Sequence, residues 1–139
     1  MSEVVGIVVA HGDLARSLVE AAEQISGVRG ALTAVSNRDC TPEQLRRRVS
    51  EAVGSGPAIV FADLVSGSCG FACRAARRDH ARVAMVTGVN LPALLEFLFH
   101  REMEVTALAE RLVEKARAGT SILAAEPELP DADRSVPHR

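Results

Sequence analysis

The chain has few of the side chains that bind nucleic acids or anionic surfaces. Its 139 residues include no Trp or Tyr, four Phe and one lysine, and the formal net charge is −2. The aromatic platforms on which bases stack are therefore missing. The charge provides no electrostatic attraction to nucleic acid or to an anionic membrane. We therefore expect neither as a partner.

Long apolar runs and a cysteine framework are missing as well. The longest apolar runs, residues 7–10 and 58–62 among them, are far too short to span a bilayer. The first residues show no charged start followed by an apolar segment and a cleavage site, so we expect no secretory signal. Three cysteines, an odd number, do not make a disulfide framework. These features predict a cytoplasmic protein.

What the sequence does contain is a regular alternation of apolar and amphipathic segments. The length predicts one domain with a single core. The alternation predicts an α/β fold, a three-layer α/β/α sandwich around a parallel sheet. Strands are expected at residues 4–10, 31–36, 57–62 and 82–86. Helices are expected at residues 14–26, at 42–53, from the loop at 66–68 to 78, at 92–100 and at 105–118.

The last residues of the chain differ in composition from the expected domain. We place the domain at residues 1–124 and a disordered tail at 125–139, because the tail holds three Pro and four acidic residues with little apolar content. Residues 121–124 are predicted to form a short edge strand or a strand donated to a partner.

Capping residues mark the starts of the first two expected helices. Asp13 precedes the first helix and is a suitable N-cap. Thr41, Pro42 and Gln44 form a capping-box pattern at the start of the second. The apolar face expected for the first helix comprises Leu14, Leu18, Ala21, Ala22 and Ile25.

The first expected strand ends at His11, followed by Gly12, Asp13 and the start of a helix. Strand ends in parallel sheets are where open α/β proteins place their chemistry. The helix N-terminus beside the histidine favours negative charge such as phosphate. We therefore predict that His11 handles an anion or carries one covalently, with Gly12 and Asp13 at the helix mouth. The open alternative is a packed or capping histidine.

Two further strand ends carry polar loops that lead into helices. The third strand ends in Asp63 and the loop Ser66-Gly67-Ser68, and the fourth ends in a loop that contains Asn90. In a parallel sheet of order 2-1-3-4, His11 and Asp63 face each other across the topological switch point. A carboxylate there orients the imidazole and stabilises its cationic form, and small loop residues let backbone amides approach an anion. This combination predicts phosphoryl transfer through a phosphohistidine.

Several of these residues also have a purely structural interpretation. Asp63 and Asn90 are suitable helix caps, which is compatible with a place in the site. Ser68 is expected to contact a phosphate or the backbone and not to act as a nucleophile, because no base pairs with it. Cys69 and Cys73 are expected to pack within the third helix. Because further ligands at suitable spacing are missing, no metal site is predicted.

Three segments of the chain resemble the mannose-type IIA component of the bacterial phosphoenolpyruvate:sugar phosphotransferase system (PTS). They are Val9-Ala10-His11-Gly12, Asp63 to Ser68 and Gly88-Val89-Asn90-Leu91-Pro92. The resemblance implies that the residue at His11 accepts a phosphoryl group from the phosphocarrier protein HPr and passes it to a IIB component. It implies that Asp63 supports this histidine, and that no metal or organic cofactor takes part.

The resemblance also implies an assembly and a set of supporting residues. The family fold is a four-stranded parallel sheet with a C-terminal antiparallel edge strand, here residues 121–124, exchanged in a homodimer that associates peripherally with a membrane transporter. Asn90 is expected to shape the site, and Ser66-Gly67-Ser68, with the helix dipole after Asp13, to steady the phosphoryl oxygens. Family members carry an aromatic residue, Gly-Gly, Ser or Thr, and Pro where this chain has Val65, Ser66-Gly67, Ser68 and Cys69.

Two other functions stay open at this point. One is a regulatory phosphoprotein of the PTS that transports nothing, which the altered loop and the lack of a IIB domain in this sequence favour. The other is a small-ligand binding module of flavodoxin-like shape, in which His11 only lines a pocket. A related dihydroxyacetone kinase subunit shares the fold and a histidine, but Ser is expected there in place of Gly12.

Overall fold

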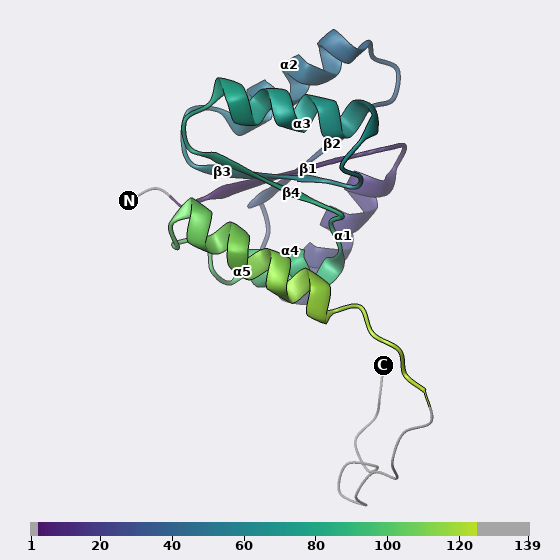
Figure 1. The fold of residues 1–139 in the computed structure, drawn as a ribbon, viewed down its shortest axis with the longest axis vertical. Helices are drawn as coiled ribbons and strands as arrows, with labels where there is room; N and C mark the ends of the chain where they lie inside the picture. Colours follow the sequence, from purple (N-terminus) through teal and green to yellow (C-terminus); the bar gives the residue numbers. More distant parts are fainter. Residues whose placement is uncertain (1–2, 125–139) are drawn as a thin grey trace, which may run out of the picture.

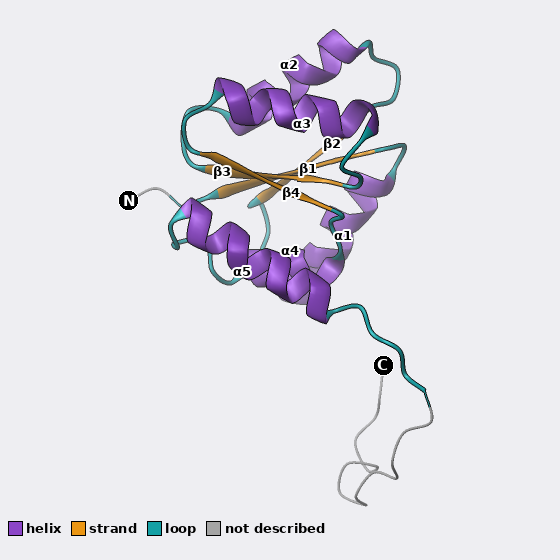
Figure 2. Ribbon diagram, in the orientation of Figure 1, coloured by secondary structure: helices purple, strands orange, loops and turns teal. Residues whose placement is uncertain are grey.

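The computed structural model describes residues 3–124, so the tail expected at 125–139 lies outside the described residues. Within that range the strands form one parallel sheet in the order β2-β1-β3-β4 (Figure 2), as the sequence predicts. The strands are β1 (Val5–Ala10), β2 (Leu32–Ser36), β3 (Ala58–Ala62) and β4 (Val83–Thr87).

Helices cover both faces of this sheet and complete the predicted three-layer α/β/α sandwich. Figure 1 shows α2 and α3 on one face and α1, α4 and α5 on the other. No helix among residues 3–124 is long and apolar enough to cross a membrane. The helices are α1 (Leu14–Ser26), α2 (Pro42–Val53), α3 (Gly67–Asp79), α4 (Leu91–Leu98) and α5 (Val105–Ala118).

The two central strands are buried on both faces, which explains why they are continuous apolar runs. Along β1, Ile7 and Val9 pack into the core beneath α2 and α3. Val8 and Ala10 point the other way, into the core beneath α1, α4 and α5. Because side chains cover both faces of β1 and β3, polar chemistry is left to the strand ends.

The α2 start has the predicted capping box: Thr41 accepts from the Gln44 N–H, and the Gln44 side chain accepts from the Thr41 N–H. The α1 start differs from expectation, because Asp13 holds the N-cap position but its side chain makes no capping hydrogen bond. Its carboxylate instead accepts from Arg38.

The apolar face predicted for α1 is confirmed in part: Ala22 is buried and Leu18 packs against the core, but the two end positions are not part of the buried face. Leu14 and Ile25 are 45% and 62% exposed, whereas the helix buries Ala15, Val19 and Ala22. Both sets of residues have helical spacing, so hydrophobicity alone does not distinguish them. The small side chains of Ala15 and Ala22 permit a close approach to the sheet.

Residues 121–124 form no strand in this single chain. Ile122 and Leu123 are 88% and 82% exposed, because nothing within the described chain pairs with them. A strand needs a partner edge for its backbone hydrogen bonds. The strand exchange in a homodimer requires a second chain and stays a prediction.

Gly6 lets α4 pack closely on β1. A Cβ at this position would lie 2.7 Å from Leu32 Cδ2 and 2.8 Å from Phe97 Cε2. The Phe97 ring also packs edge-on against Phe61, with ring centroids 5.6 Å apart. Leu32 and Phe97 therefore leave no space for a larger residue at position 6.

We expect Gly6→Ala to lower the free energy of unfolding by about 1–3 kcal/mol, the usual cost of overpacking a core. Gly56→Ala is the matched control, because a Cβ there would meet nothing within 4 Å. The control should stay within about 0.5 kcal/mol of the wild type. Urea denaturation of the three proteins measures both values. Equal stability of the two variants would contradict the proposed packing constraint.

Candidate functional site

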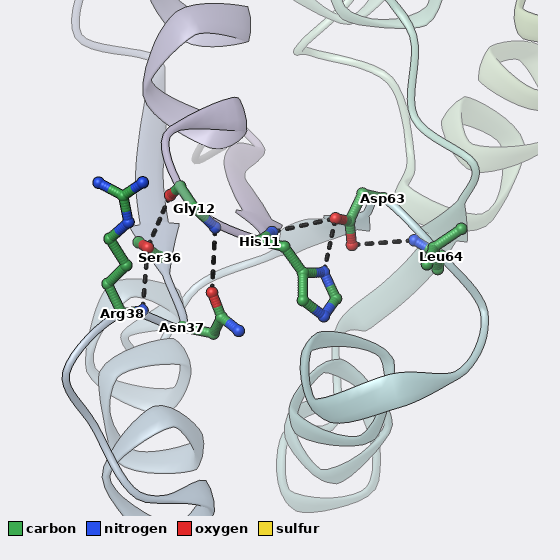
Figure 3. A network of polar contacts seen from close by, with 7 residues as sticks. All are labelled: His11, Gly12, Ser36, Asn37, Arg38, Asp63 and Leu64. Carbon is green, nitrogen blue, oxygen red and sulfur yellow. Dashed lines mark hydrogen bonds and ion pairs between the residues drawn. The ribbon is translucent and has the colours of Figure 1, made fainter.

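The carboxyl ends of β1 and β3 place His11 beside Asp63. The strands are parallel neighbours with Val9 opposite Ala62, so the residues that follow them emerge at one edge of the sheet. The Asp63 Oδ2 atom lies 2.8 Å from His11 Nδ1 and accepts from the His11 backbone N–H at 3.0 Å (Figure 3). The predicted meeting of these two residues is present in the structure.

Hydrogen bonds keep Asp63 ionised. Burial raises the pKa of the Asp63 carboxyl, but hydrogen bonds from the His11 backbone N–H and ring, and from the Leu64 N–H, outweigh it and hold this pKa below its ordinary value. The Leu64 N–H donates to Oδ1 at 3.0 Å. An ionised carboxylate can only accept, so His11 Nδ1 carries the hydrogen and Nε2 carries the lone pair in the neutral ring.

The first turn of α3 lies against the free side of this ring. Gly67 begins the helix with φ +83°, and a Cβ there would lie 3.7 Å from both Cε1 and Nε2 of His11. The first N–H groups of a helix have no intrahelical acceptor and favour an anion. The sequence assigned the dipole to the helix after Asp13, whereas the helix that contacts the imidazole edge is α3.

Two serines flank Gly67 at this helix start. Ser66 holds the N-cap position without a side-chain capping hydrogen bond. Ser66 is exposed and Ser68 is partly buried. The His11 side chain itself is 42% exposed, so its ring is accessible to a second protein. The structure thus brings the predicted loop next to the predicted histidine.

A third strand end supports the His11 loop, and sequence reasoning missed it. At the end of β2, Asn37 Oδ1 accepts from the Gly12 N–H at 3.1 Å, and the Ser36 hydroxyl donates to the Gly12 carbonyl at 2.7 Å (Figure 3). Arg38 donates to Asp13 Oδ1 at 3.0 Å. The predicted strand order already placed β2 beside β1, and that order was the signal available. Because the Gly12 backbone N–H already donates to Asn37, it stabilises the loop and is not free to bind an anion.

Asn90 lies at the end of β4 and its polar atoms are used elsewhere. Its Oδ1 accepts from the Ala93 N–H at 3.1 Å and thereby caps α4. Its Nδ2 donates to the Ala116 carbonyl at 2.9 Å and ties α4 to α5. The hydrogen bonds found for Asn90 within residues 3–124 therefore do not reach His11 or Asp63.

Cys69 lies closer to the histidine than the sequence suggested. It belongs to the first turn of α3, is fully buried, and its Sγ lies within 4.8 Å of ligand atoms of both His11 and Asp63. Burial, with the Asp63 charge added, raises the pKa of the Cys69 thiol to about 11. Burial likewise raises the pKa of Cys73 to about 12. Both Cys69 and Cys73 have the packing role expected for them, in the core beneath α2 and α3.

Residues 6–116 match the model of a protein family described as the PTS system fructose IIA component. The chain belongs to this family. His11, Asp63 and Cys69 all fall within the matched range of this IIA chain. A comparison with curated proteins found no match.

Solved structures share the fold of the IIA chain. The PTS component EIIA from Streptococcus agalactiae has a TM-score of 0.79 at 20% identity, over 86% of this chain and 96% of that one. The mannose/sorbose specific IIA subunit from Enterococcus faecalis has a TM-score of 0.77 at 24% identity, over 93% and 100%. A sigma-54 interaction domain protein from Enterococcus faecalis has a TM-score of 0.70 at 14% identity, over 85% and 93%. These similarities show a common fold.

The lowered pKa of Asp63 predicts how the stability of the IIA chain depends on pH. A group with a depressed folded-state pKa stabilises the fold above its unfolded-state pKa, and this contribution is lost as the pH falls through the folded-state pKa. Asp63→Asn should therefore lower the free energy of unfolding by about 1–3 kcal/mol at neutral pH. The difference from the wild type should shrink below about pH 4.

Urea denaturation at a series of pH values measures this difference. Asp39→Asn, which removes an exposed carboxylate, is the control and should follow the wild type throughout. A constant gap between wild type and Asp63→Asn from neutral to acidic pH would contradict the assignment of an ionised Asp63.

Proposed function

We propose that this IIA chain is a phosphoryl carrier, in which His11 accepts a phosphoryl group from phospho-HPr and passes it to a IIB component. The observation that carries the proposal is the 2.8 Å contact between His11 Nδ1 and Asp63 Oδ2. This contact holds the hydrogen on Nδ1 and leaves the Nε2 lone pair free as a nucleophile. Nε2 faces the start of α3, where a negative group is favoured.

The transfer step requires only the histidine and its carboxylate. The Nε2 lone pair attacks the phosphorus, and a nitrogen–phosphorus bond forms. The bond from phosphorus to the donor group on HPr breaks, and its electron pair stays with HPr. The ring then carries a positive charge with its hydrogen still on Nδ1, and the Asp63 carboxylate balances this charge. Transfer to the IIB component repeats the step with His11 as the leaving group.

The surrounding loops suit the three phosphoryl oxygens. Gly67 has no side chain, so space remains beside Nε2. Ser66, the N-cap residue, and Ser68 flank Gly67 at the start of α3. Asp13 would repel a phosphoryl group, but its charge is paired with Arg38 at 3.0 Å. We assign these serines and the amide groups near Gly67 to phosphate binding.

Exposed apolar side chains suit transient docking of HPr and of a IIB component. Isolated exposed apolar residues are common, but a group of them beside an accessible histidine is typical of a protein-binding surface. A cytoplasmic homodimer, formed through residues 121–124 and docking on a membrane transporter, is part of the same proposal. The apolar side chains in question, with exposures from 45% to 57%, are Leu14, Leu64, Val65 and Phe71.

A second candidate function is regulation without transport. One solved structure that shares the fold is a sigma-54 interaction domain protein, and the loop from Val65 to Cys69 departs from the pattern of transport components. In this alternative His11 is phosphorylated in the same way, and the phosphorylated chain controls another protein. Neighbouring genes for membrane IIC and IID components favour transport, and their absence favours regulation.

The direct test incubates the purified chain with phosphoenolpyruvate, enzyme I and HPr. We expect an acid-labile phosphate on the wild type and none on His11→Ala, because the phosphorus is bonded to imidazole nitrogen. His80→Ala is the matched control and should be labelled like the wild type, since His80 ends α3 at the opposite end from Gly67. Equal labelling of wild type and His11→Ala would contradict His11 as the acceptor, and labelling of neither would leave the ligand-binding module as the better interpretation.

The role of Asp63 has a kinetic signature of its own. In Asp63→Asn the neutral amide no longer balances the positive charge that the ring acquires on phosphorylation. Whichever way the amide is turned, its N–H₂ group also meets a backbone N–H donor, of His11 or of Leu64, which disturbs the position of the ring. We expect the rate of phosphoryl transfer from phospho-HPr to fall by about 10²–10⁴-fold. Rapid-quench measurement with purified phospho-HPr gives this rate. A wild-type rate in this variant would remove Asp63 from the mechanism.

A further inference from the structure

Three different metal-ligating side chains converge at the edge of the sheet. An imidazole nitrogen of His11, a carboxylate oxygen of Asp63 and the Sγ of Cys69 all lie within 4.8 Å of one another. They come from the end of β1, the end of β3 and the first turn of α3. In a tetrahedral zinc site, ligand atoms are separated by roughly 3.3–3.8 Å, as follows from bond lengths near 2.0–2.3 Å. A shift of about 1 Å or less per side chain therefore brings these atoms to coordinating distance.

The donor set and the charges favour a particular class of metal ion. Imidazole nitrogen, carboxylate oxygen and thiolate sulfur together suit Zn²⁺ and similar borderline divalent ions, whereas Mg²⁺ and Ca²⁺ prefer oxygen alone. One carboxylate and one thiolate balance two positive charges, which a partly buried ion requires.

Burial at the three positions provides a route in and an open coordination position. Cys69 is fully buried, the Asp63 side chain is 11% exposed and the His11 side chain is 42% exposed. A metal ion therefore reaches the thiol past the imidazole, and water completes the coordination on the exposed side. Three protein ligands and one water are a common arrangement for zinc.

We propose that the His11–Asp63–Cys69 cluster binds Zn²⁺ or a similar thiophilic divalent ion, and that the bound ion blocks phosphorylation of His11. The sulfur–metal bond replaces the sulfur–hydrogen bond of Cys69, and the proton leaves to solvent. If Nε2 coordinates the metal, its lone pair is occupied. If Nδ1 coordinates, the ring hydrogen resides on Nε2, which then has no lone pair. Either geometry stops the transfer. The inhibitory half of this proposal, that bound metal blocks phosphorylation, rests on the proposed function. The binding half, that the three side chains hold a metal ion, does not.

The binding half is tested on the untagged full chain with Co²⁺ as a spectroscopic probe and Zn²⁺ as its competitor. We expect one Co²⁺ per chain, a thiolate-to-metal charge-transfer band in the near ultraviolet, and loss of that band when Zn²⁺ is added. Cys69→Ser and Cys69→Ala should abolish the band and weaken Zn²⁺ binding by about tenfold or more. Cys73→Ser, which removes another buried thiol one turn along α3, should keep both.

Circular dichroism of each variant shows that it is folded, and using two substitutions at position 69 keeps the test valid if one of them unfolds. The absence of a thiolate band in the wild type would overturn the site. An equal band in Cys69→Ala and the wild type would overturn it as well.

The inhibitory half uses phospho-HPr that has been purified away from enzyme I, so that Zn²⁺ acts on the acceptor step alone. For each protein we compare the transfer rate with and without Zn²⁺. We expect Zn²⁺ to lower the transfer rate at least tenfold in the wild type and in Cys73→Ser. In Cys69→Ala the rates with and without Zn²⁺ should be nearly equal. Zinc bound through Cys69 with an unchanged wild-type rate would overturn inhibition. No labelling even without metal would overturn the proposed function, while the Co²⁺ spectrum still reports on the site.

Discussion

One carboxylate oxygen determines how the site of this protein is built. Asp63 Oδ2 accepts from both the backbone N–H and the ring Nδ1 of His11, so one atom fixes the position of the residue and the tautomer of its side chain. It does so only because β1 and β3 are hydrogen-bonded neighbours in register. The sheet order is therefore a requirement of the site and not merely its scaffold.

The close packing of the sheet explains why the site is made of loops. The side chains of β1 and β3 alternate between two apolar cores, which leaves no place for an ionised group along either strand. Chemistry is confined to the carboxyl edge, where Gly12 and Gly67 both adopt positive φ values, +61° and +83°. Glycine at these positions lets the chain turn sharply from strand to helix and keeps backbone close to the imidazole.

The sequence was sufficient for the fold and for the pairing of His11 with Asp63, because apolar runs and strand order follow from strong, repeated patterns. It was insufficient where alternative packings, loop paths or rotamers have similar energies. On α1 the predicted apolar face and the buried face overlap at Ala22, and packing against the sheet buries Ala15 and Val19 while it leaves Leu14 and Ile25 exposed. The contact of Asn37 with Gly12 and the approach of Cys69 to His11 depend on loop paths and rotamers, which no periodicity encodes.

The same negative charge serves two kinds of occupant. In the proposed mechanism the Asp63 carboxylate balances the cationic ring of a phosphohistidine, and in the proposed metal site it attracts a divalent ion for the same electrostatic reason. Both occupants require a nitrogen lone pair of His11, so they exclude one another. By thermodynamic linkage, metal weakens the phosphorylated state by the same factor by which phosphorylation weakens metal binding. Of the three side chains in the proposed metal site, Cys69 is the one that the proposed phosphoryl transfer does not use, so substitutions at Cys69 distinguish the two proposals.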